Sequence, residues 1–332
     1  MTETLVTVII PVYNGAEFLG AAIESAQAQT YRSLEIIIVD DGSTDTSLQI
    51  AKEYAAQDER IRVIAQPNGG VAKARNTAIA AARGEFIAPL DADDLWIPDK
   101  IARQMACMLA TGDDCGFVYS WWALIDPAGK IVDRSPRWTV AGRRFETLLL
   151  INFTGNASIP LFRKHCLVEA GVYNSALAAA KSGGCEDLEV VLRIAARYSI
   201  GVVPEILMGY RRSPGSMSTD CNRMWRSRQM VLAHIGEVWP SLDPAVLRAS
   251  DRQFCMYLAA ASYWSGKLKE AVRWGLRCGL RLPFLFAPYL VKLSLFPPNK
   301  RQQTQVMRPG EAIDTSLIPD PLLPFNRILS LD

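Results

Sequence analysis

Short apolar runs alternate with amphipathic segments through the first 97 residues, and this rhythm constrains the fold more than any other feature of the sequence. Runs rich in β-branched residues and almost free of polar ones are typical of strands buried on both faces of a parallel sheet. They predict strands at 6–12, 34–39, 61–65 and 86–90, with helices at 17–29, 48–55 and 70–82 between them. Strands and helices that alternate in this way predict βαβ units and a mostly parallel, doubly wound α/β sheet.

Polar side chains follow three of these predicted strands directly. Asn14 comes after the first, Asp41 after the second, and the acidic run 91–94 after the fourth. Ligands of open α/β sheets bind outside the carboxyl ends of the strands, so these three loops are expected to meet at one site. Lys73 and Arg75, near the start of the third helix, add positive charge there. Acidic groups holding Mg²⁺ or Mn²⁺, beside basic side chains, suit a bound pyrophosphate.

Two common nucleotide-binding classes are disfavoured. The turn 11–20 lacks GxGxxG, which argues against a dinucleotide-dependent dehydrogenase, and no GxxxxGK[ST] occurs anywhere, which argues against a P-loop NTPase. The bland alternative for the run 91–94 is a solvated acidic turn that caps the helix starting near Pro98.

Charge and cysteine content limit the partners and the compartment. The formal charge of +2 on 332 residues gives no field that would attract nucleic acid. Seven cysteines without a CxxC pair argue against a disulfide framework and favour a reducing cytoplasm. The chain runs into its first strand without the basic region of a secretory signal, and no apolar stretch reaches the roughly 18–20 residues that span a bilayer. These features predict a cytoplasmic protein that is soluble or peripheral.

Beyond Pro98 the pattern is less regular. It predicts a helix at 99–110, strands at 115–125 and 130–133, a helix at 145–152 and an extended segment at 158–162. Glu186 and Asp187 then open a helix, because apolar residues follow at helical spacing. A helix amino terminus favours ionised carboxylates, and such a group can accept a proton from a hydroxyl. The alternative is that the two acids merely cap the helix.

Five segments together resemble the family 2 inverting glycosyltransferases with the GT-A fold. They are Val8–Asn14, Ile38–Asp45, Asn68–Asn76, Gly84–Trp96 with its Asp91-Ala92-Asp93, and Glu186-Asp187. The segments occur in the order that the family has, and the resemblance covers roughly residues 5–215. It implies a Rossmann-like sheet flanked by helices and transfer of one sugar from a nucleotide-sugar, with a UDP-sugar as the expected donor.

The resemblance also implies roles for residues on the donor side. Pro11 and Tyr13, followed by Asn14, would line the base and ribose pocket, and Asp41 would hydrogen-bond the nucleobase. Lys73 or Arg75 would lie near the base or the phosphates, and the sequence does not choose between them.

The family's DxD motif and its acidic pair supply the remaining roles. Asp91, with the adjacent Ala92, would contact the ribose or the sugar, and Asp93 would bind the Mn²⁺ or Mg²⁺ that holds the diphosphate. Asp187 would be the general base, and Glu186 would help to place the acceptor.

One segment departs from the family pattern. Many relatives have a histidine near the position of Ser213, and the only histidines here, His165 and His234, lie outside any motif. Metal binding would then depend on Asp93, phosphate and water, with Arg211 and Arg212 as sources of phosphate-binding charge. Residues 210–220 are rich in Gly, Ser and Pro and are interpreted as a lid over the donor or as a linker.

The remainder of the chain predicts helices at 222–238, 244–265, 267–279 and 283–296. We therefore predict a GT-A catalytic domain at 1–215 (nucleotide-sugar half about 1–97, acceptor half about 98–215), a helical region at 216–300 and an irregular tail at 301–332. Basic residues within 267–296 adjoin an apolar, aromatic segment and favour contact with an anionic membrane on its inner face. The alternative is a helix packed on the catalytic domain with a solvated basic face.

Together these features predict an enzyme that transfers a sugar to a hydroxyl of a glycan, a lipid-linked glycan or a small acceptor during cell-surface polysaccharide synthesis. A non-catalytic nucleotide-sugar-binding protein of the same fold is the alternative. The oligomeric state stays open.

Overall fold

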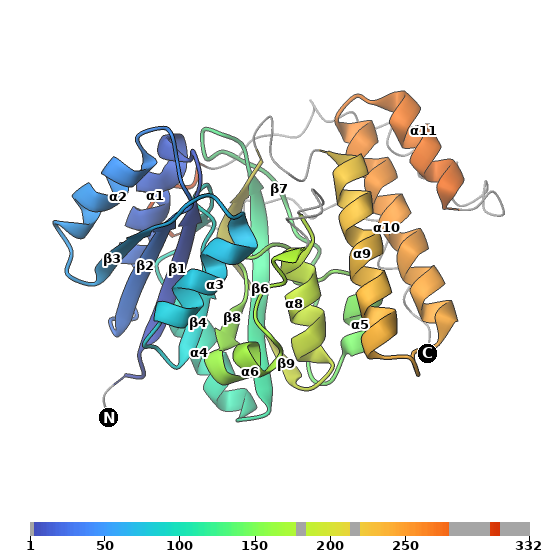
Figure 1. The fold of residues 1–332 in the computed structure, drawn as a ribbon, viewed down its shortest axis with the longest axis horizontal. Coiled ribbons are helices and arrows are strands. Elements are labelled where there is room, and N and C mark those ends of the chain that lie inside the picture. Colours follow the sequence, from blue (N-terminus) through green and yellow to red (C-terminus); the bar gives the residue numbers. More distant parts are fainter. Residues whose placement is uncertain (1–2, 177–183, 213–219, 279–305, 313–332) are drawn as a thin grey trace.

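The computed structural model describes residues 3–176, 184–212, 220–278 and 306–312. In these ranges the strands form one mixed sheet of nine strands in the order β3-β2-β1-β4-β8-β6-β9-β5, with β7 paired to β6. Helices flank the sheet, and α9, α10 and α11 stand together at one end of the molecule (Figure 1). The strands are β1 (Val6–Val12), β2 (Leu34–Asp40), β3 (Ile61–Ala65), β4 (Phe86–Pro89), β5 (Leu95–Trp96), β6 (Cys115–Ile125), β7 (Ile131–Arg134), β8 (Leu161–Arg163) and β9 (Ser199–Arg211). The helices are α1 (Ala16–Gln27), α2 (Ser47–Ala55), α3 (Val71–Ala81), α4 (Lys100–Thr111), α5 (Phe145–Leu150), α6 (Lys164–Glu169), α8 (Glu186–Ala195), α9 (Cys221–Val238), α10 (Pro244–Trp264) and α11 (Leu268–Arg277).

The first half of the sheet is parallel, as the sequence predicts. β1 lies between β2 and β4, with Val6 opposite both Leu34 and Phe86, and β3 extends the sheet beyond β2. Every residue of β1 and of β2 is buried, which is why their sequences are mostly apolar rather than alternating between apolar and polar residues. The predicted α/β class is confirmed.

The second half of the sheet is mixed. β8 runs antiparallel to both β4 and β6, β9 runs parallel to β6, and β5 runs antiparallel to β9. The sequence does not predict β9, because Pro204 and Glu205 interrupt its apolar pattern. In the pairing of β6 with β9, Ser120 lies opposite Val203 and the next residue, Trp121, lies opposite Ile206. Pro204 and Glu205 are therefore left unpaired and form a bulge inside a long strand.

Other differences concern short elements and boundaries. The helices predicted at 99–110 and 145–152 begin and end within two residues of their predicted limits. The two-residue β5 and the six-residue α6 are missed, because so few residues establish no periodicity. The first residues of the proposed lid, Tyr210 and Arg211, belong to β9, and 213–219 lie outside the described residues.

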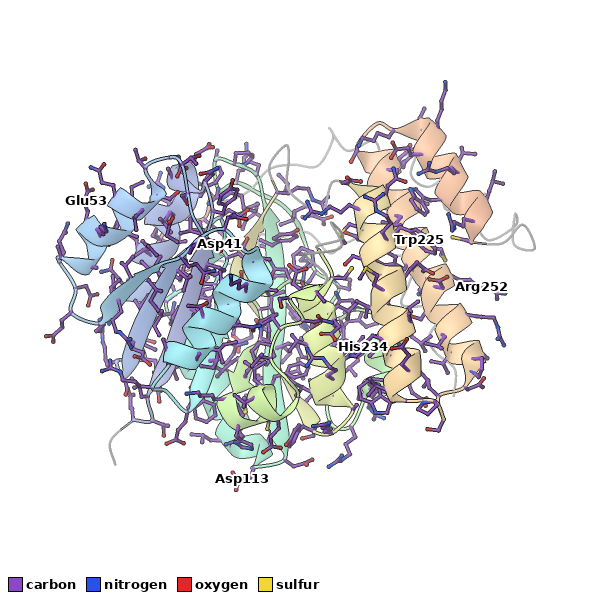
Figure 2. All side chains as sticks on the ribbon, in the orientation of Figure 1. Asp41, Glu53, Asp113, Trp225, His234 and Arg252 are labelled. Atoms are coloured by element: carbon purple, nitrogen blue, oxygen red, sulfur yellow. The ribbon has the colours of Figure 1, made fainter. Side chains whose placement is uncertain are left out.

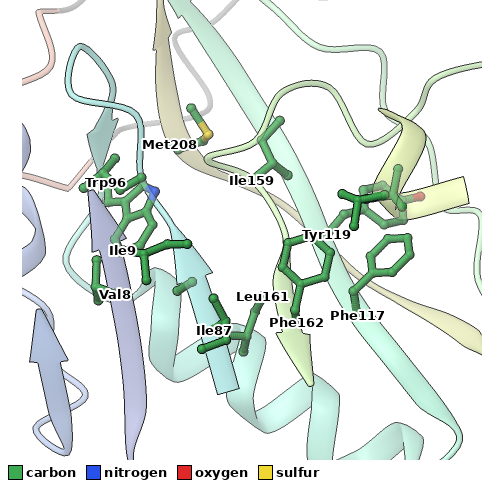
Figure 3. Close-up of a cluster of buried hydrophobic side chains, with 14 of the residues drawn as sticks. Val8, Ile9, Ile87, Trp96, Phe117, Tyr119, Ile159, Leu161, Phe162 and Met208 are labelled. Atoms are coloured by element: carbon green, nitrogen blue, oxygen red, sulfur yellow. The ribbon is translucent and has the colours of Figure 1, made fainter. Parts of the chain in front are cut away.

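The buried core joins the two halves of the sheet. Val8, Ile9 and Ile87 fill the parallel half, and Phe117 and Phe162 meet beyond them with ring centroids 5.9 Å apart (Figure 3). Trp96, fully buried on β5, donates its indole N–H to the carbonyl of Ser158 at 3.0 Å. The loop after β4 is therefore anchored in the core on both sides.

The C-terminal helices α9, α10 and α11 confirm three of the four predicted there, and the one at 283–296 lies outside the described residues. Of the tail, residues 306–312 are described, and Met307 packs against β9 while its N–H donates to the carbonyl of Gly129 at 2.7 Å. Within the described ranges we find no helix with the length and apolar character needed to cross a bilayer. The domain limits at 215 and 300 stay predictions.

Candidate active site

Asn14 ties the loop after β1 to the loop after β2. Its φ of +49° places it in the left-handed region, which asparagine tolerates better than most residues. Its side-chain oxygen accepts hydrogen bonds from the N–H of Thr44 at 2.7 Å and of Asp45 at 3.3 Å, and its own N–H donates to the Ser43 hydroxyl at 3.0 Å. Asn14 thus shapes the rim of the site, and its contact with a nucleotide stays a prediction.

Asp41 lies at the carboxyl end of β2 with its carboxylate turned toward the start of α3 (Figure 2). This carboxylate is 2% exposed and accepts hydrogen bonds from the N–H of Gly70 at 2.7 Å, the N–H of Gly69 at 3.0 Å and the amide of Gln66 at 2.6 Å. Gly70 has a φ of +86°, so a side chain there would strain the turn that brings its N–H to Asp41. These hydrogen bonds hold the Asp41 carboxylate between the end of β2 and the start of α3.

Around Asp41, the other predicted donor-side residues differ in exposure. Pro11 is buried within β1, whereas the Tyr13 side chain is 54% exposed and stands at the rim. Lys73 is also exposed, on the first turn of α3. A ligand that enters from solvent can thus reach the side chains of Tyr13 and Lys73, whereas Pro11 is part of the buried strand beneath them.

Arg75 occupies a buried position at the centre of the site. Its Nη2 lies 2.5 Å from Asp91 Oδ1, its Nη1 lies 3.7 Å from Glu186 Oε1, and its guanidinium stands 5.1 Å from the centre of the Tyr173 ring. Burial opposes the charge, but Asp91, Tyr173 and Glu186 outweigh it and raise the pKa of Arg75 above its ordinary value. The Arg75 cation thus joins the acidic run after β4 to the acidic pair at the start of α8.

The three carboxylates after β4 have different environments. Asp91 is 28% exposed and Asp93 is partly buried, whereas Asp94 is fully buried. Asp94 accepts hydrogen bonds from the Ser158 hydroxyl at 2.6 Å, the Asn156 amide at 2.7 Å and the Arg211 N–H at 2.9 Å. Asp94 is therefore the structural anchor of the loop, whereas Asp91 and Asp93 remain partly exposed.

The surroundings of Asp93 disfavour a negative charge on its carboxyl group. Burial, followed by the charge of Asp91, raises the pKa of Asp93 to about 6. A divalent cation would relieve this repulsion, because hard ions prefer carboxylate oxygens. Among the described residues no three His, Cys, Asp or Glu side chains gather as a metal site, and the role of Asp93 as a metal ligand stays a prediction.

The acidic pair opens α8, as predicted. Glu186 is 4% exposed, and its Oε2 accepts the N–H of Gly184 at 2.7 Å. Asp187 accepts the N–H of Leu188 at 2.7 Å, and burial, followed by the charge of Glu186, raises the pKa of Asp187 to about 7. A carboxylate with such a pKa can take up a proton near neutral pH.

Arg211, which the sequence suggested as a source of phosphate-binding charge, directs its guanidinium to backbone carbonyls, and its contact with a phosphate stays a prediction. Its Nε donates to the carbonyl of Asp93 at 2.7 Å, and its Nη1 donates to the carbonyls of Asp126 and Pro127 at 3.0 and 2.7 Å. The side chain is buried, with its guanidinium 4.6 Å from the centre of the Phe18 ring. Arg211 thus braces the loop after β4 from below, and Ser213 lies outside the described residues.

Tyr173, Asn76 and Ser158 support the site without having been predicted. Asn76 bonds both backbone groups of Tyr173, donating to its carbonyl at 2.7 Å and accepting its N–H at 2.9 Å, so that the ring covers Arg75. The Ser158 hydroxyl accepts the N–H of Asp91 at 2.9 Å while it donates to Asp94. Asn76 is the last residue of the motif Asn68–Asn76, so the sequence could have identified it. Tyr173 and Ser158 lie in distant loops outside every motif, so the sequence could not.

Known proteins resemble this chain in both sequence and fold. Residues 7–154 match the family described as glycosyl transferase family 2. The chain is 42% identical over 134 residues to the putative glycosyltransferase EpsH of Bacillus subtilis, and the match covers 40% of this chain and 38% of that protein. The chain thus spans less than half the length of that relative.

Two solved structures share the fold. The Staphylococcus aureus protein TarS 1-349 in complex with UDP-GlcNAc has a TM-score of 0.60 and 19% identity, over 81% of this chain and 78% of that one. The mannosyltransferase PcManGT of Pyrobaculum calidifontis, in complex with GDP-Man and Mn²⁺, has a TM-score of 0.59 and 19% identity, over 90% and 82%. Such likeness establishes the fold, which is that of the GT-A glycosyltransferases.

Proposed function

Since residues 7–154 make this chain a member of glycosyl transferase family 2, we propose that it transfers a single sugar from a nucleotide-sugar to an acceptor hydroxyl, with inversion at the anomeric carbon. The observation that carries this proposal is the position of Arg75 between Asp91 and Glu186. Because one buried cation contacts both, the donor-side carboxylates and the acidic pair at the start of α8 face a common space. A transferase needs this arrangement, since donor and acceptor must meet in one site.

On the donor side, the Asp41 carboxylate hydrogen-bonds the nucleobase, and the exposed Tyr13 lies beside the base and ribose. The donor proposed is a uridine nucleotide-sugar, and the UDP-GlcNAc complex of TarS supports this choice. A guanosine nucleotide-sugar is the second candidate, because PcManGT binds GDP-Man. Asp93 would hold Mn²⁺ or Mg²⁺ against the diphosphate, and PcManGT with its bound Mn²⁺ supports this. The ion supplies charge neutralisation for the departing nucleoside diphosphate.

On the acceptor side, Asp187 takes the proton from the attacking hydroxyl. Its raised pKa, about 7, matches this task, because a base is most effective when its pKa lies near the working pH. Glu186, fixed by the Gly184 N–H and by Arg75, orients the acceptor beside it. Attack from this side, opposite the diphosphate, inverts the anomeric centre. The acceptor proposed is a hydroxyl of a cell-surface glycan or of its lipid-linked precursor.

The cysteines support action in a reducing compartment. All seven are free thiols, and five of them are buried. We therefore place the reaction in the cytoplasm.

The first experiment is a donor panel. UDP-, dTDP- and GDP-sugars are incubated with the full chain in Mn²⁺ or in EDTA, and the release of nucleoside diphosphate and the binding of each donor are measured. One donor should be hydrolysed slowly, in Mn²⁺ alone, and Asp93→Ala should lower this rate by about 10²-fold or more, since it removes the protein ligand of the ion. Asp113→Ala is the matched control, because this exposed aspartate lies far from the loops of the site (Figure 2).

Equal turnover in EDTA, or in Asp93→Ala, would remove Asp93 and the metal from the mechanism. Tight donor binding without turnover, even when acceptor glycans are added, would favour the non-catalytic nucleotide-sugar-binding protein instead.

A further inference from the structure

The helix α11 has two apolar faces, and among the residues that the structure describes only one of them is covered. On the inner face, Ala271 is 4% and Trp274 1% exposed, and the Trp274 ring lies 5.5 Å from the ring of Trp225 on α9. On the outer face, Leu268, Val272 and Leu276 are 61%, 56% and 53% exposed. Residues four apart share one face of a helix, so these three form a continuous apolar stripe in contact with water.

Basic side chains border this stripe. Lys269, Arg273 and Arg277 each follow a residue of the stripe and so lie about 100° further around the helix. All three are exposed, although the Arg273 guanidinium also contacts Asn222 and that of Arg277 stands 4.4 Å from the centre of the Trp225 ring. Glu270 is the one acidic residue of α11. The outer face of α11 is therefore apolar along one edge and positive along the other.

We propose that the outer face of α11, formed by Leu268, Val272 and Leu276 with the neighbouring basic residues, docks on an anionic membrane surface. A helix with an apolar stripe beside basic residues lies in the plane of the lipid interface, where the stripe is withdrawn from water and the cations meet anionic headgroups. The charge of the region agrees. Residues 221–278 contain nine Lys and Arg against four Asp and Glu, whereas the whole chain is nearly neutral.

The same charges disfavour a second copy of the chain as the occupant. An antiparallel two-fold contact through α11 would bring the basic edge of one copy close to the basic edge of the other, and the repulsion would oppose it.

The position of α11 suits a surface-bound substrate. α11 stands at the end of the molecule away from β3, and its first turn lies on the side that carries the carboxyl ends of β1 and β2 (Figure 1). The first turn of α11 and the loops of the candidate site thus lie on the same side of the molecule. The docking itself does not depend on the proposed sugar transfer.

Vesicle sedimentation tests the proposal with the full chain. Wild-type protein is spun with vesicles of phosphatidylcholine alone and with vesicles that contain 30% phosphatidylglycerol. We expect binding to the anionic vesicles and weaker binding in high salt. The triple variant Leu268→Ser, Val272→Ser, Leu276→Ser should bind about 10- to 100-fold more weakly. Lys267 is the exposed N-cap residue of α11, and the double variant Lys267→Glu, Lys269→Glu should bind at least about tenfold more weakly. Leu109→Ser is the matched control, because Leu109 on α4 is 63% exposed and distant from α11, and it should bind as the wild type does.

Three results would overturn the docking proposal. They are the absence of wild-type binding to anionic vesicles, undiminished binding by the triple variant, and a wild-type dimer that the triple variant converts to a monomer in light scattering. Donor hydrolysis in solution is measured on the same preparations and should be equal in all variants. Loss of vesicle binding with normal hydrolysis therefore concerns α11 alone, and failed hydrolysis with normal vesicle binding concerns the proposed function alone.

Discussion

At the scale of single residues, Arg75 determines how the candidate site is arranged. A guanidinium this deeply buried is stable only beside negative charge, and Asp91 and Glu186 supply it from two segments that are far apart in the chain. Asp187 lies beside Glu186, and burial, followed by the charge of Glu186, raises the pKa of Asp187 to about 7, although the Arg75 cation works against this shift. Arg75 is internal and Lys73 is exposed, and which of the two lies near the base or the phosphates stays a prediction.

The raised pKa of Asp187 predicts a pH-dependent rate. The unprotonated carboxylate is the active form of a base, so transfer should rise with pH through about 7 and then level off. Glu186→Gln removes a charge that raises this pKa, so the rise should move to lower pH. Asp187→Asn should lower kcat by about 10²- to 10⁴-fold and abolish the rise, with donor affinity nearly unchanged. The measurement is kcat against pH for the three proteins.

Glu59→Gln provides the control, since this acidic residue precedes β3 and lies in neither segment of the site. An Asp187→Asn enzyme with an unchanged pH profile would exclude Asp187 as the base.

At the scale of elements, the strands place the site and polar side chains hold the loops around them. Asn14 links the loops after β1 and β2, Asp94 fixes the loop after β4, and Glu35 plays the corresponding part at the opposite end of the sheet. The Glu35 side chain, on β2, is 2% exposed and accepts hydrogen bonds from the Thr7 hydroxyl at 2.6 Å and from Arg83 Nε at 2.8 Å. It thereby pins the connection from α3 to β4.

Glu35→Gln should destabilise the protein by about 1–3 kcal/mol at neutral pH, because a charged acceptor of several hydrogen bonds is lost. Burial works against the Glu35 charge, but the bonds from Thr7 and Arg83 outweigh it and lower the pKa of Glu35 below its ordinary 4.5. A lowered pKa stabilises the fold above the unfolded value and loses that effect as the pH falls through the folded value. The gap between the two proteins should therefore narrow below about pH 4.5, as measured by denaturant unfolding across pH.

Glu53→Gln is the matched control, since Glu53 lies exposed on α2 (Figure 2) and should change stability by under about 0.5 kcal/mol. A gap between wild type and Glu35→Gln that stays constant down to pH 3 would show that the Glu35 charge does not contribute.

At the scale of the whole molecule, the C-terminal helices are packed onto the sheet region. Phe145 on α5 and Trp239 after α9 have ring centroids 5.2 Å apart, and His234 on α9 lies 3.5 Å from Glu189 on α8. Arg228 makes the deepest polar contact, donating from Nη2 to the carbonyl of Leu149 at 2.9 Å and to the Ser250 hydroxyl. These contacts join α5, α8, α9 and α10 into one packed body.

Arg228→Ala should lower the free energy of unfolding by about 2–3 kcal/mol, because it removes charged hydrogen bonds and buried packing at this junction. Arg252→Ala is the control, since Arg252 on α10 has an exposed side chain (Figure 2) and should cost under about 0.5 kcal/mol. Denaturant unfolding followed by circular dichroism gives both values. If Arg228→Ala were as stable as Arg252→Ala, the junction would not depend on this side chain.

The sequence by itself determined the elements whose burial is uniform and the residues that stand at their ends. β1 and β2 are wholly buried, so their apolar runs were sufficient to predict them, and Asp41, Asp91 and Asp187 follow from the motifs and from the rule that ligands meet strands at their carboxyl ends. The helices α9, α10 and α11 were likewise predicted from periodicity.

Only the tertiary structure decided the partners of these residues. Arg75 meets Glu186 across more than a hundred residues, Arg211 donates to the Asp93 carbonyl, and Asp94 becomes the buried anchor of its loop. β9 escaped prediction because a bulge at Pro204 breaks its pattern, and the exposed stripe of α11 appeared only once Trp274 had taken the inner face. Local sequence fixes backbone preference and periodicity, whereas the charge state and the partner of a buried polar group depend on distant segments that meet only in the folded chain.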